Sequence, residues 1–476
     1  MKLKILTVVA SVLFAATAAN ATVEISKKPT SNMTCSGGVC TPTAKDAVLN
    51  VSDLATMLSG GDVTIQSASI APDIVVKAAL SWTSANRLTF DAHRSVEIDK
   101  PVTATGTGAI TITTNDGGSN GDLSFVGKGN VAFWDLNSSL VINGNSYVLV
   151  GDIATLAADI ADNPSGFYAL AKDYDATADG TYTAPPINSA LTGTVEGLGH
   201  VFSKVAMHTM ASDSNGLFED VWIGGVVRDL GVVDSKLEAA NFEAAALLSG
   251  GNSGLISRCW ATGSIHTSGT GSVGALVGHN GGTIVDSHVN ANVHGRSPKG
   301  EDIGGLVGVS DGGTIETSYA LGTVKVAKQF APNVGGLVGE NRGIIENSFA
   351  RNAVVSARGN GGGGLGGLVG LNTSAGQISN SYAAGPITII SDIVAGGLIG
   401  FDGAQAGSIS NSYWDLDMGI GNSSQGAGNV PNDPGITGLT TQQLQAGLPA
   451  GFDSKVWAID PNKNQGFPYL KDVPTK

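Results

Sequence analysis

The chain has 476 residues, with 26 Lys and Arg against 40 Asp and Glu, which gives a formal net charge of −14. Charged residues make up only 14% of the sequence, below the soluble-protein average of about 25%. An acidic surface repels phosphate, so the composition argues against nucleic acid as a partner. The hydrophobic share of 42% is enough for a sizeable core in one elongated or several compact domains.

Residues 1–21 have the features of a secretory signal peptide. Two lysines precede an apolar run from Ile5 to about Ala16, and Ala19-Asn-Ala21 supplies small residues at a cleavage site. The run is shorter than the roughly 20 residues that a transmembrane helix needs, and no later segment qualifies. We therefore expect Sec-dependent export and no membrane span in the mature chain.

The leader that follows, residues 22–47, holds two of the three cysteines. Cys35 and Cys40 enclose a flexible Ser-Gly-Gly-Val loop in a chain bound for an oxidising compartment, which favours a local disulfide. The alternative, a pair of metal ligands, needs two more nearby Cys or His residues, which the sequence does not offer. Cys259 is expected to be buried and free.

Upstream of the repeats, residues 48–143 are expected to form an irregular β-solenoid. Short strands divided by Gly, Asn and Asp are predicted over residues 63–66, 87–90, 95–98 and 109–113. A connecting segment, residues 144–212, carries Ile153, Leu156 and Ile160 at helical spacing before Pro164, which predicts one short helix.

The strongest signal is an internal repeat of about 30 residues over 213–419. Later copies read Gly-Gly-Leu-Val-Gly or a close variant, and two degenerate copies precede them, giving seven units. The leucine of each unit is expected to line one core column: Leu217, Leu247, Leu276, Leu306, Leu337, Leu368 and Leu398.

Each unit contains three short strand patterns separated by glycine and Asn or Asp, and none has a helical period. Three strands in about 30 residues is one rung of a parallel β-helix. The sequence therefore predicts an all-β fold, a parallel β-helix with about seven rungs, and strand twist favours the right hand. Residues 420–476 lose the period, and their aromatic residues near Trp457 and Phe467 are expected to cover the last rung as a cap.

Aligning the second strand of each unit predicts a stacked column that consists of Trp260, His288, Tyr319, Phe349, Tyr382 and Tyr413. Strand alternation puts Phe349 on the same face as Ile345, which predicts that the column points into the core. An outward column that binds sugars is the alternative. In either case His288 replaces an aromatic ring and is not expected to be catalytic.

Candidate chemical sites are weak. Asp173, Asp175 and Asp179 lie in a flexible loop and could supply oxygen ligands to calcium, but their spacing is not that of an EF-hand, and solvated turns are favoured. The Gly-x-Ser-x-Gly match at Ser310 has no histidine after it, as a hydrolase of that type needs. We expect no cofactor and no enzyme activity.

The Gly-Gly-Leu-Val-Gly phrase followed by Gly-Thr-Ile and Asn-Ser-Tyr resembles the GLUG repeat of large bacterial surface proteins. Segments such as residues 81–90, 115–125 and 412–415 resemble filamentous-haemagglutinin-like adhesins. These resemblances imply a secreted or surface-attached β-helical stalk of a Gram-negative bacterium. GLUG repeats also occur in some IgA-directed metalloproteases, but the chain has no His-Glu-x-x-His motif to carry that activity.

Together these features predict a non-catalytic, adhesin-like protein that attaches to host, matrix or other cells. Its expected partner is a glycan or protein on a host or bacterial surface. Two alternatives remain at this point: a β-helical enzyme that acts on polysaccharides, and a structural component of a biofilm or matrix. The fold alone does not distinguish them.

Overall fold

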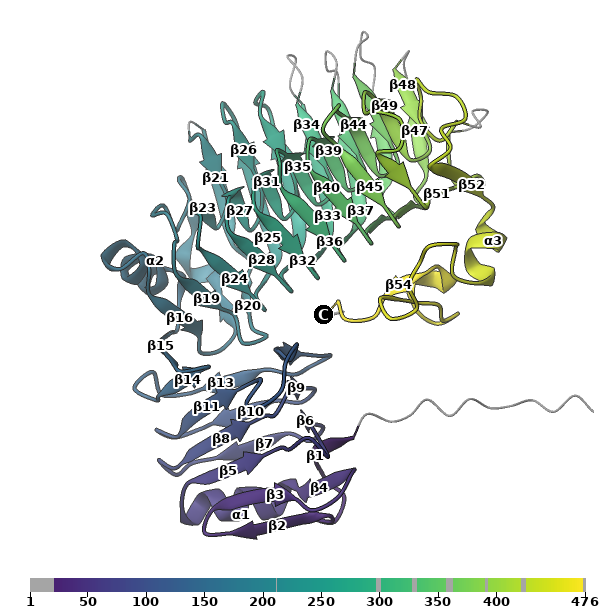
Figure 1. Cartoon of the computed structure of the whole chain (residues 1–476). Helices are drawn as coiled ribbons and strands as arrows, with labels where there is room; N and C mark the ends of the chain where they lie inside the picture. Colours follow the sequence, from purple (N-terminus) through teal and green to yellow (C-terminus); the bar gives the residue numbers. More distant parts are fainter. Residues whose placement is uncertain are drawn as a thin grey trace, which may run out of the picture.

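Figure 1 shows a computed structural model of the chain, in which two arms of coiled β-strands meet at an elbow. The structure describes residues 21–210, 212–296, 301–327, 332–356, 363–389, 393–420 and 425–473. The predicted signal peptide lies outside these ranges, apart from its last residue. Within them, no helix is long and apolar enough to cross a membrane. The expected all-β parallel solenoid is confirmed.

One sheet of 16 strands, here called the spine sheet, runs through both arms. Its strands are parallel except where β2 meets β3 and β14 meets β15. In spatial order they are β2 (Met33–Ser36), β3 (Val39–Pro42), β5 (Val63–Gln66), β8 (Arg87–Asp91), β11 (Ala109–Thr113), β14 (Leu140–Ile142), β15 (Asn145–Val150), β16 (Phe167–Leu170), β19 (Thr194–Glu196), β24 (Val226–Arg228), β28 (Leu255–Ser257), β32 (Thr283–Val285), β36 (Thr314–Glu316), β40 (Ile344–Glu346), β45 (Gln377–Ser379) and β50 (Ile409–Ser410).

The N-terminal arm adds two more sheets to the spine sheet. The first, here called the N-arm wall sheet, contains β12 (Leu123–Phe125), β9 (Val96–Ile98), β6 (Asp73–Val76), β1 (Thr22–Ser26) and β4 (Ala47–Asn50). The second contains β13 (Val131–Phe133), β10 (Val102–Ala104) and β7 (Leu80–Trp82). The solenoid therefore begins at Thr22, inside the segment that the sequence predicts to be a leader.

The main arm adds three sheets. The main-arm wall sheet has the path β17 (Tyr174–Asp175), β20 (Val201–Ser203), β25 (Gly231–Ala239), β29 (Trp260–Thr267), β33 (His288–Gly295), β37 (Tyr319–Val326), β41 (Phe349–Ala350), β46 (Tyr382–Ala383), β51 (Ser412–Asp415) and β52 (Ile436–Leu439). Beside this path lie β18 (Thr181–Tyr182), β21 (Ala206–Thr209), β42 (Ala353–Ser356) and β47 (Ile387–Ile389).

Two seven-stranded sheets complete the main arm. The first contains β22 (Ser214–Asn215), β26 (Ala244–Ala245), β30 (Ser272–Val273), β34 (Asp302–Gly304), β38 (Asn333–Gly335), β43 (Gly364–Gly366) and β48 (Val394–Gly396). The second contains β23 (Phe218–Val221), β27 (Ser249–Asn252), β31 (Val277–Asn280), β35 (Val307–Ser310), β39 (Val338–Asn341), β44 (Val369–Asn372) and β49 (Ile399–Asp402). Near the C-terminus, β53 (Trp457–Ala458) and β54 (Tyr469–Leu470) form an antiparallel pair.

The main-arm coils therefore have four strands, or five where the strand in the wall sheet is divided (β41 and β42, β46 and β47), not the three that the sequence predicts. The Gly-Gly-Leu-Val-Gly phrase is not one strand but two, because the chain bends between β34 and β35 at Leu306. All seven repeat leucines lie at this bend and are fully buried. Their backbones bond from coil to coil, for example Leu306 N to Leu337 O at 2.9 Å. Over the described residues the main arm has seven such coils, and the two arms together stack about 10, more than the roughly seven rungs that the sequence predicts.

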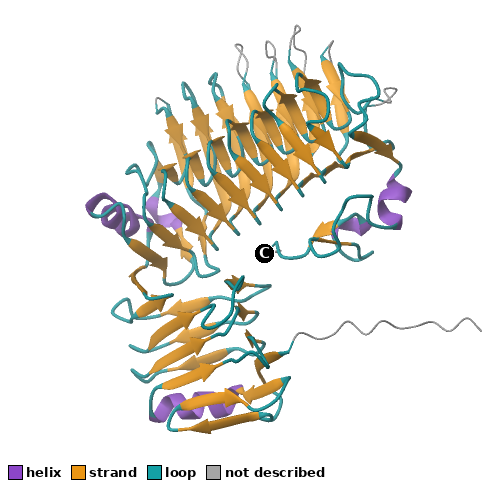
Figure 2. Cartoon of the chain, in the orientation of Figure 1, coloured by secondary structure: helices purple, strands orange, loops and turns teal. Residues whose placement is uncertain are grey.

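Helices lie at the margins of the solenoid (Figure 2). They are α1 (Val51–Gly60), α2 (Ile153–Asp162), α3 (Thr441–Ala446) and the short 3-10 turns η1 (Ala176–Asp179) and η2 (Asn464–Gly466). The structure contains the predicted α2, which buries Ile153, Leu156 and Ile160. Sequence reasoning missed α1, although Asn50 caps its N-terminus through Ser52 N and Asp53 N.

The elbow is built by a reversal within the spine sheet. Asn143 and Gly144 both have positive φ, which suits the tight hairpin that joins β14 to β15. In β16 the alternate residues belong to different cores: Ala169 packs in the N-terminal arm, and Tyr168 packs in the main arm. The two arms thus bury opposite faces of one sheet. At this hairpin the strand direction reverses, and the core lies on the other face of the sheet. Because both change together, the coils of the two arms have the same handedness.

Candidate functional site

The corner between the spine sheet and the main-arm wall sheet decides which side chains face outward. One residue in each of the last six coils has left-handed φ there: Arg258 (51°), Asp286 (52°), Thr317 (44°), Asn347 (48°), Asn380 (49°) and Asn411 (44°). The next residue is Cys259 or a buried serine. Ser348 Oγ accepts from Ser318 N at 3.1 Å and donates to Glu346 O at 2.8 Å. This serine ladder satisfies backbone groups that the corner would otherwise leave unpaired.

The predicted aromatic column exists, but it faces outward and not into the core. Ile345 packs in the main-arm core, whereas Phe349 belongs to a separate cluster on the outer side. The left-handed residue between them, Asn347, interrupts the alternation on which the prediction rested. Stacked ring centroids lie 4.8 Å apart for His288 and Tyr319, 4.7 Å for Tyr319 and Phe349, and 5.0 Å for Phe349 and Tyr382.

Backbone pairing extends the column by one residue at each end, with Trp260 beside His288 and Tyr413 beside Tyr382. A side chain at Gly231 would lie 2.4 Å from the Trp260 ring, so this ring needs the glycine beneath it. Burial lowers the pKa of His288 to about 4, which keeps the imidazole neutral at physiological pH. No described group lies within hydrogen-bond distance of its Nδ1.

The C-terminal segment, residues 440–473, covers the exposed side of this column. Apolar side chains pack against it as one cluster: Leu444, Phe452, Trp457, Phe467, Leu470 and Val473. The Tyr382 hydroxyl donates to Pro468 O at 2.7 Å, and Trp457 Nε1 donates to Asn347 Oδ1 at 3.2 Å. The predicted cap therefore folds back along the side of the solenoid, and its end lies between the arms (Figure 1).

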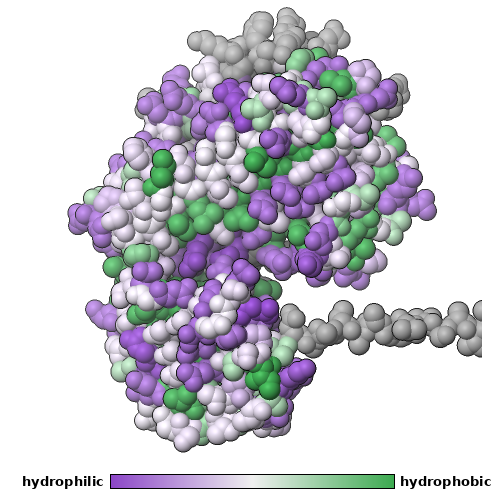
Figure 3. Space-filling view, viewed as in Figure 1, coloured by the Kyte–Doolittle hydropathy of each residue, from purple (hydrophilic) through white to green (hydrophobic). Residues whose placement is uncertain are grey.

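A groove of about 1660 Å³ lies where the two arms and the C-terminal segment meet. Figure 3 shows hydrophilic residues on the visible surface at this junction. One wall is the outer face of the N-arm wall sheet, another is the first part of the aromatic column, and the third is the C-terminal segment. The lining of the groove includes Glu24, Asp73, Arg94, Glu97, Asp286, His288, Asn290, Tyr319, Tyr469 and Lys471.

Ion pairs neutralise part of the N-arm wall. Arg94 Nε lies 2.7 Å from Asp73 Oδ1, and Lys28 Nζ lies 2.9 Å from Glu24 Oε1. Glu97 differs, because burial and the neighbouring Asp99 carboxyl raise its pKa to about 7. The groove thus contains one carboxyl that exchanges a proton near neutral pH.

A charged network fixes the elbow beneath the groove. Arg258 holds Asp229 through Nε and Nη2 at 2.8 and 2.9 Å, and its Nη1 reaches Asp122 of the N-terminal arm at 2.7 Å. Nearby, Arg228 Nε lies 2.5 Å from Glu196 Oε2. Burial raises the pKa of Glu196, and Arg228 opposes that rise. Sequence reasoning missed this network because Asp122 and Arg258 are 136 residues apart and Asp122 lies outside the repeats.

The calcium candidates have other partners. Asp173 Oδ1 lies 2.9 Å from His200 Nδ1, Asp175 accepts from Lys204 Nζ at 2.6 Å, and Asp179 accepts from Tyr174 and Tyr182 hydroxyls at 2.5 and 2.6 Å. Lys204 and Thr177 together hold the pKa of Asp175 at about 2. Across the described ranges, no group of three or more His, Cys, Asp or Glu side chains could hold a metal ion.

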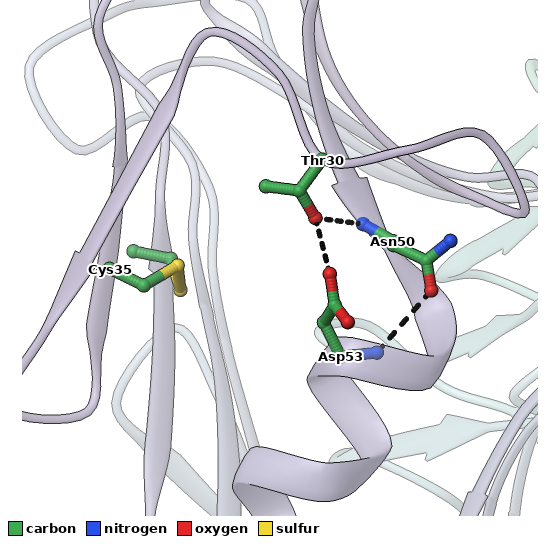
Figure 4. The surroundings of a disulfide bond; sticks show 5 residues. Thr30, Cys35, Asn50 and Asp53 are labelled. Atoms are coloured by element: carbon green, nitrogen blue, oxygen red, sulfur yellow. Dashed lines mark hydrogen bonds between the residues drawn. A yellow bond between two sulfur atoms is a disulfide. The ribbon is translucent and has the colours of Figure 1, made fainter.

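Cys35 and Cys40 face each other on the β2–β3 hairpin and form the expected disulfide. Figure 4 shows its surroundings, where Thr30 Oγ1 donates to Asp53 Oδ2 at 2.7 Å and accepts from Asn50 N at 2.9 Å. These bonds tie the segment before the hairpin to the start of α1. Cys259 is buried and free, and burial raises the pKa of its thiol. In its coil, Cys259 occupies the buried corner position that a serine of the serine ladder occupies in the following coils.

Comparisons with known proteins support part of the sequence interpretation. The family described as the GLUG motif matches residues 361–390. Halomucin of Haloquadratum walsbyi (strain DSM 16790 / HBSQ001) is 27% identical over 243 residues, which is 48% of this chain and 2% of halomucin. The chain thus spans a very small part of that relative.

Two solved structures match parts of this chain. A proposed immunoglobulin A1 protease from Bacteroides ovatus has a TM-score of 0.42 and 17% identity, covering 69% of this chain and 92% of that one. A structure named IgA1 protease has a TM-score of 0.36 and 19% identity, covering 54% of this chain and 20% of that one. The motif and the halomucin match fit a secreted or surface β-helical protein. The resemblance to filamentous haemagglutinins stays a prediction.

Proposed function

We propose that the protein is a secreted, adhesin-like β-solenoid of a Gram-negative bacterium that binds a surface glycan in the groove between its arms, without catalysis. The groove is the observation that carries this proposal. Its volume of about 1660 Å³ exceeds the roughly 300–1,000 Å³ of small-molecule pockets. A segment of a polymer fits such a space better than a metabolite does.

The lining supports a glycan in particular. Carboxylates and the exposed Asn290 amide offer hydrogen bonds to sugar hydroxyls, and Tyr469 adds an aromatic surface at the C-terminal wall. The opposite charges of Asp73 and Arg94 on the N-arm wall already form an ion pair with each other. A neutral polar ligand therefore replaces water in the groove without breaking these ion pairs.

Two tryptophan substitutions on β33 test the proposal. Asn290 lines the groove, whereas Asn292 is exposed two residues further along the same strand and lies outside the groove lining. Asn290→Trp should weaken binding on a glycan array at least tenfold because the ring occupies the groove, and Asn292→Trp should leave binding unchanged. Equal binding by wild type and Asn290→Trp would contradict the groove as the site. Binding to a protein array alone would replace the glycan with a protein ligand.

One observation favours a second candidate, a polysaccharide-acting enzyme. The pKa of Glu97, raised to about 7 by burial and Asp99, is what a general acid at neutral pH needs. Under this alternative, wild-type protein releases shorter products from a bound glycan and Glu97→Gln abolishes the release. Binding that survives Glu97→Gln, with no product from wild type, supports the non-catalytic function. A purely structural matrix role predicts no binding by any variant.

A further inference from the structure

A row of basic side chains crosses the outer face of the main-arm wall sheet. His266 on β29 is the register partner of His294 on β33, and His294 is the register partner of Lys325 on β37. The residue before each of them packs in the main-arm core, so strand alternation points the three basic side chains outward. Arg296 follows the end of β33 and is exposed. These four residues are here called the basic row.

The basic row is locally positive on a chain whose net charge is −14. Along their whole lengths, β29, β33 and β37 contain no Asp or Glu. The acidic side chain next to the row is Glu238 on β25, whose Oε2 lies 3.0 Å from His208 Nδ1. Burial lowers the pKa of His294, and the positive charges of the other three members of the row lower it further. The surroundings of this imidazole therefore attract an anion.

The row repeats at the spacing of the coils. Neighbouring strands lie about 4.8 Å apart, and the ring centroids of His266 and His294 lie 5.5 Å apart. One sugar ring of an extended glycan covers about one such interval, so the carboxylates of a uronic-acid chain meet the row at whole numbers of coils. In an extended peptide, side chains on one face recur about every 6.5–7 Å, which does not match the row. The spacing thus favours an acidic glycan over an acidic peptide.

Uncharged polar side chains lie beside the basic row. Ser264 comes two residues before His266 on β29, and Thr323 comes two residues before Lys325 on β37, so both lie on the same outer face as the row. Both are partly exposed. Their hydroxyl groups donate and accept hydrogen bonds, as the hydroxyl groups of sugars do. The face therefore offers positive charge to the carboxylates of a uronic-acid chain and hydrogen bonds to its hydroxyl groups.

We propose that the basic row binds an acidic glycan whose sugars carry carboxylates, with the glycan chain lying along the axis of the main arm. Successive coils stack along that axis, so the glycan contacts one coil after another. None of the four residues lines the groove, which makes this a second binding surface, independent of the one proposed above. Each contact at an exposed charge is weak, and several coils together supply the affinity.

Calorimetric titration of the untagged mature protein with oligogalacturonate, a chain of uronic acids, tests the row. Lys325→Glu should weaken binding about tenfold because repulsion replaces attraction, and His294→Gln should weaken it about two- to fivefold. Lys100→Glu is the matched control. It changes the net charge by the same amount, but Lys100 is exposed between β9 and β10 of the N-terminal arm, so its affinity should equal that of wild type. Circular dichroism verifies that all variants are folded.

Two further measurements separate charge from shape. Methyl-esterified oligogalacturonate keeps the sugar chain but lacks the negative charges, so it should bind at least about tenfold more weakly. Wild-type affinity should rise between about pH 7.5 and about pH 5.5, because a bound carboxylate favours the charged imidazolium form of His266 and His294. The double variant His266→Gln/His294→Gln should lose this rise, since Lys325 and Arg296 keep their charge throughout the range.

Three results would overturn the proposal outright. The first is no binding by wild type, and the second is equal binding of the methyl ester, since charge would then play no part. The third is equal weakening by Lys100→Glu and Lys325→Glu, because the total charge of the chain would then explain the effect. Tighter binding of polyglutamate than of oligogalacturonate would also contradict it and would replace the glycan with an acidic peptide.

Discussion

Replacing Trp457 with alanine should release the C-terminal segment from the aromatic column without unfolding the solenoid. Trp457 is fully buried and its ring lies 4.5 Å from Phe452, 5.9 Å from Tyr382 and 6.0 Å from Phe349 between centroids. Its Nε1 also bonds to Asn347. These contacts belong to a cluster separate from the cores of both arms.

Loss of a buried tryptophan costs about 3–5 kcal/mol, and this cost falls on the local opening of residues 440–473. A change of 1.4 kcal/mol corresponds to a factor of ten. Amide exchange through local opening should therefore accelerate from about 10²-fold to about 4 × 10³-fold in this segment. The coils between β30 and β45 keep their own core, so their exchange should not change.

Hydrogen exchange followed by mass spectrometry measures both regions at once. Trp134→Ala is the matched control, because this tryptophan is 69% exposed and its loss should change stability by no more than about 0.5 kcal/mol. Unchanged protection of residues 440–473 in Trp457→Ala would refute the reasoning. So would a parallel loss of protection in the main-arm coils, since the cluster would then not be separate.

Three further outcomes are expected. Ser348→Ala leaves Ser318 N unpaired and should cost about 1–3 kcal/mol, read as a lower denaturation midpoint. Folding raises the pKa of Glu97 to about 7, so the folded chain binds more protons than the unfolded chain between about pH 4.5 and 7. The free energy of unfolding of wild type, relative to that of Glu97→Gln, should therefore decline as the pH rises through this window. Thermal melts at several pH values measure this decline. Intact-mass analysis should reveal two alkylated thiols at Cys35 and Cys40 only after reduction, and a native sample that is already alkylated at both would contradict the disulfide.

The periodic part of the fold could be predicted because each coil repeats the same environment. The leucine column from Leu217 to Leu398 follows directly from a nearly constant spacing, and backbone hydrogen bonds join all successive leucines but Leu247 and Leu276. The same logic places the stacked rings, whose strands pair in register. Repetition predicts neighbours across coils well, because every coil has the same length to within a few residues.

The direction of the rings could not be predicted from alternation alone. Side chains alternate between the two faces of a sheet only within an unbroken strand. The left-handed residue Asn347 interrupts this alternation between Ile345 and Phe349. The sequence does carry a signal of the corner, because Asn or Asp occupies this position in most coils and tolerates left-handed φ. The number of strands was wrong for a related reason, since a bend at Leu306 divides an apolar phrase that looks continuous.

The groove depends on parts of the chain that do not repeat, which explains why sequence reasoning did not find it. An outward aromatic column leaves a large apolar face that water would contact, and the C-terminal segment covers it from Tyr319 to Tyr413. The column begins before the covered stretch, at Trp260, so one of its ends remains beside the N-terminal arm. There the ionic contact between Arg258 and Asp122 holds the two arms together. The repeats thus supply one regular wall, and the elbow and the C-terminal segment, each present once, convert that wall into a groove.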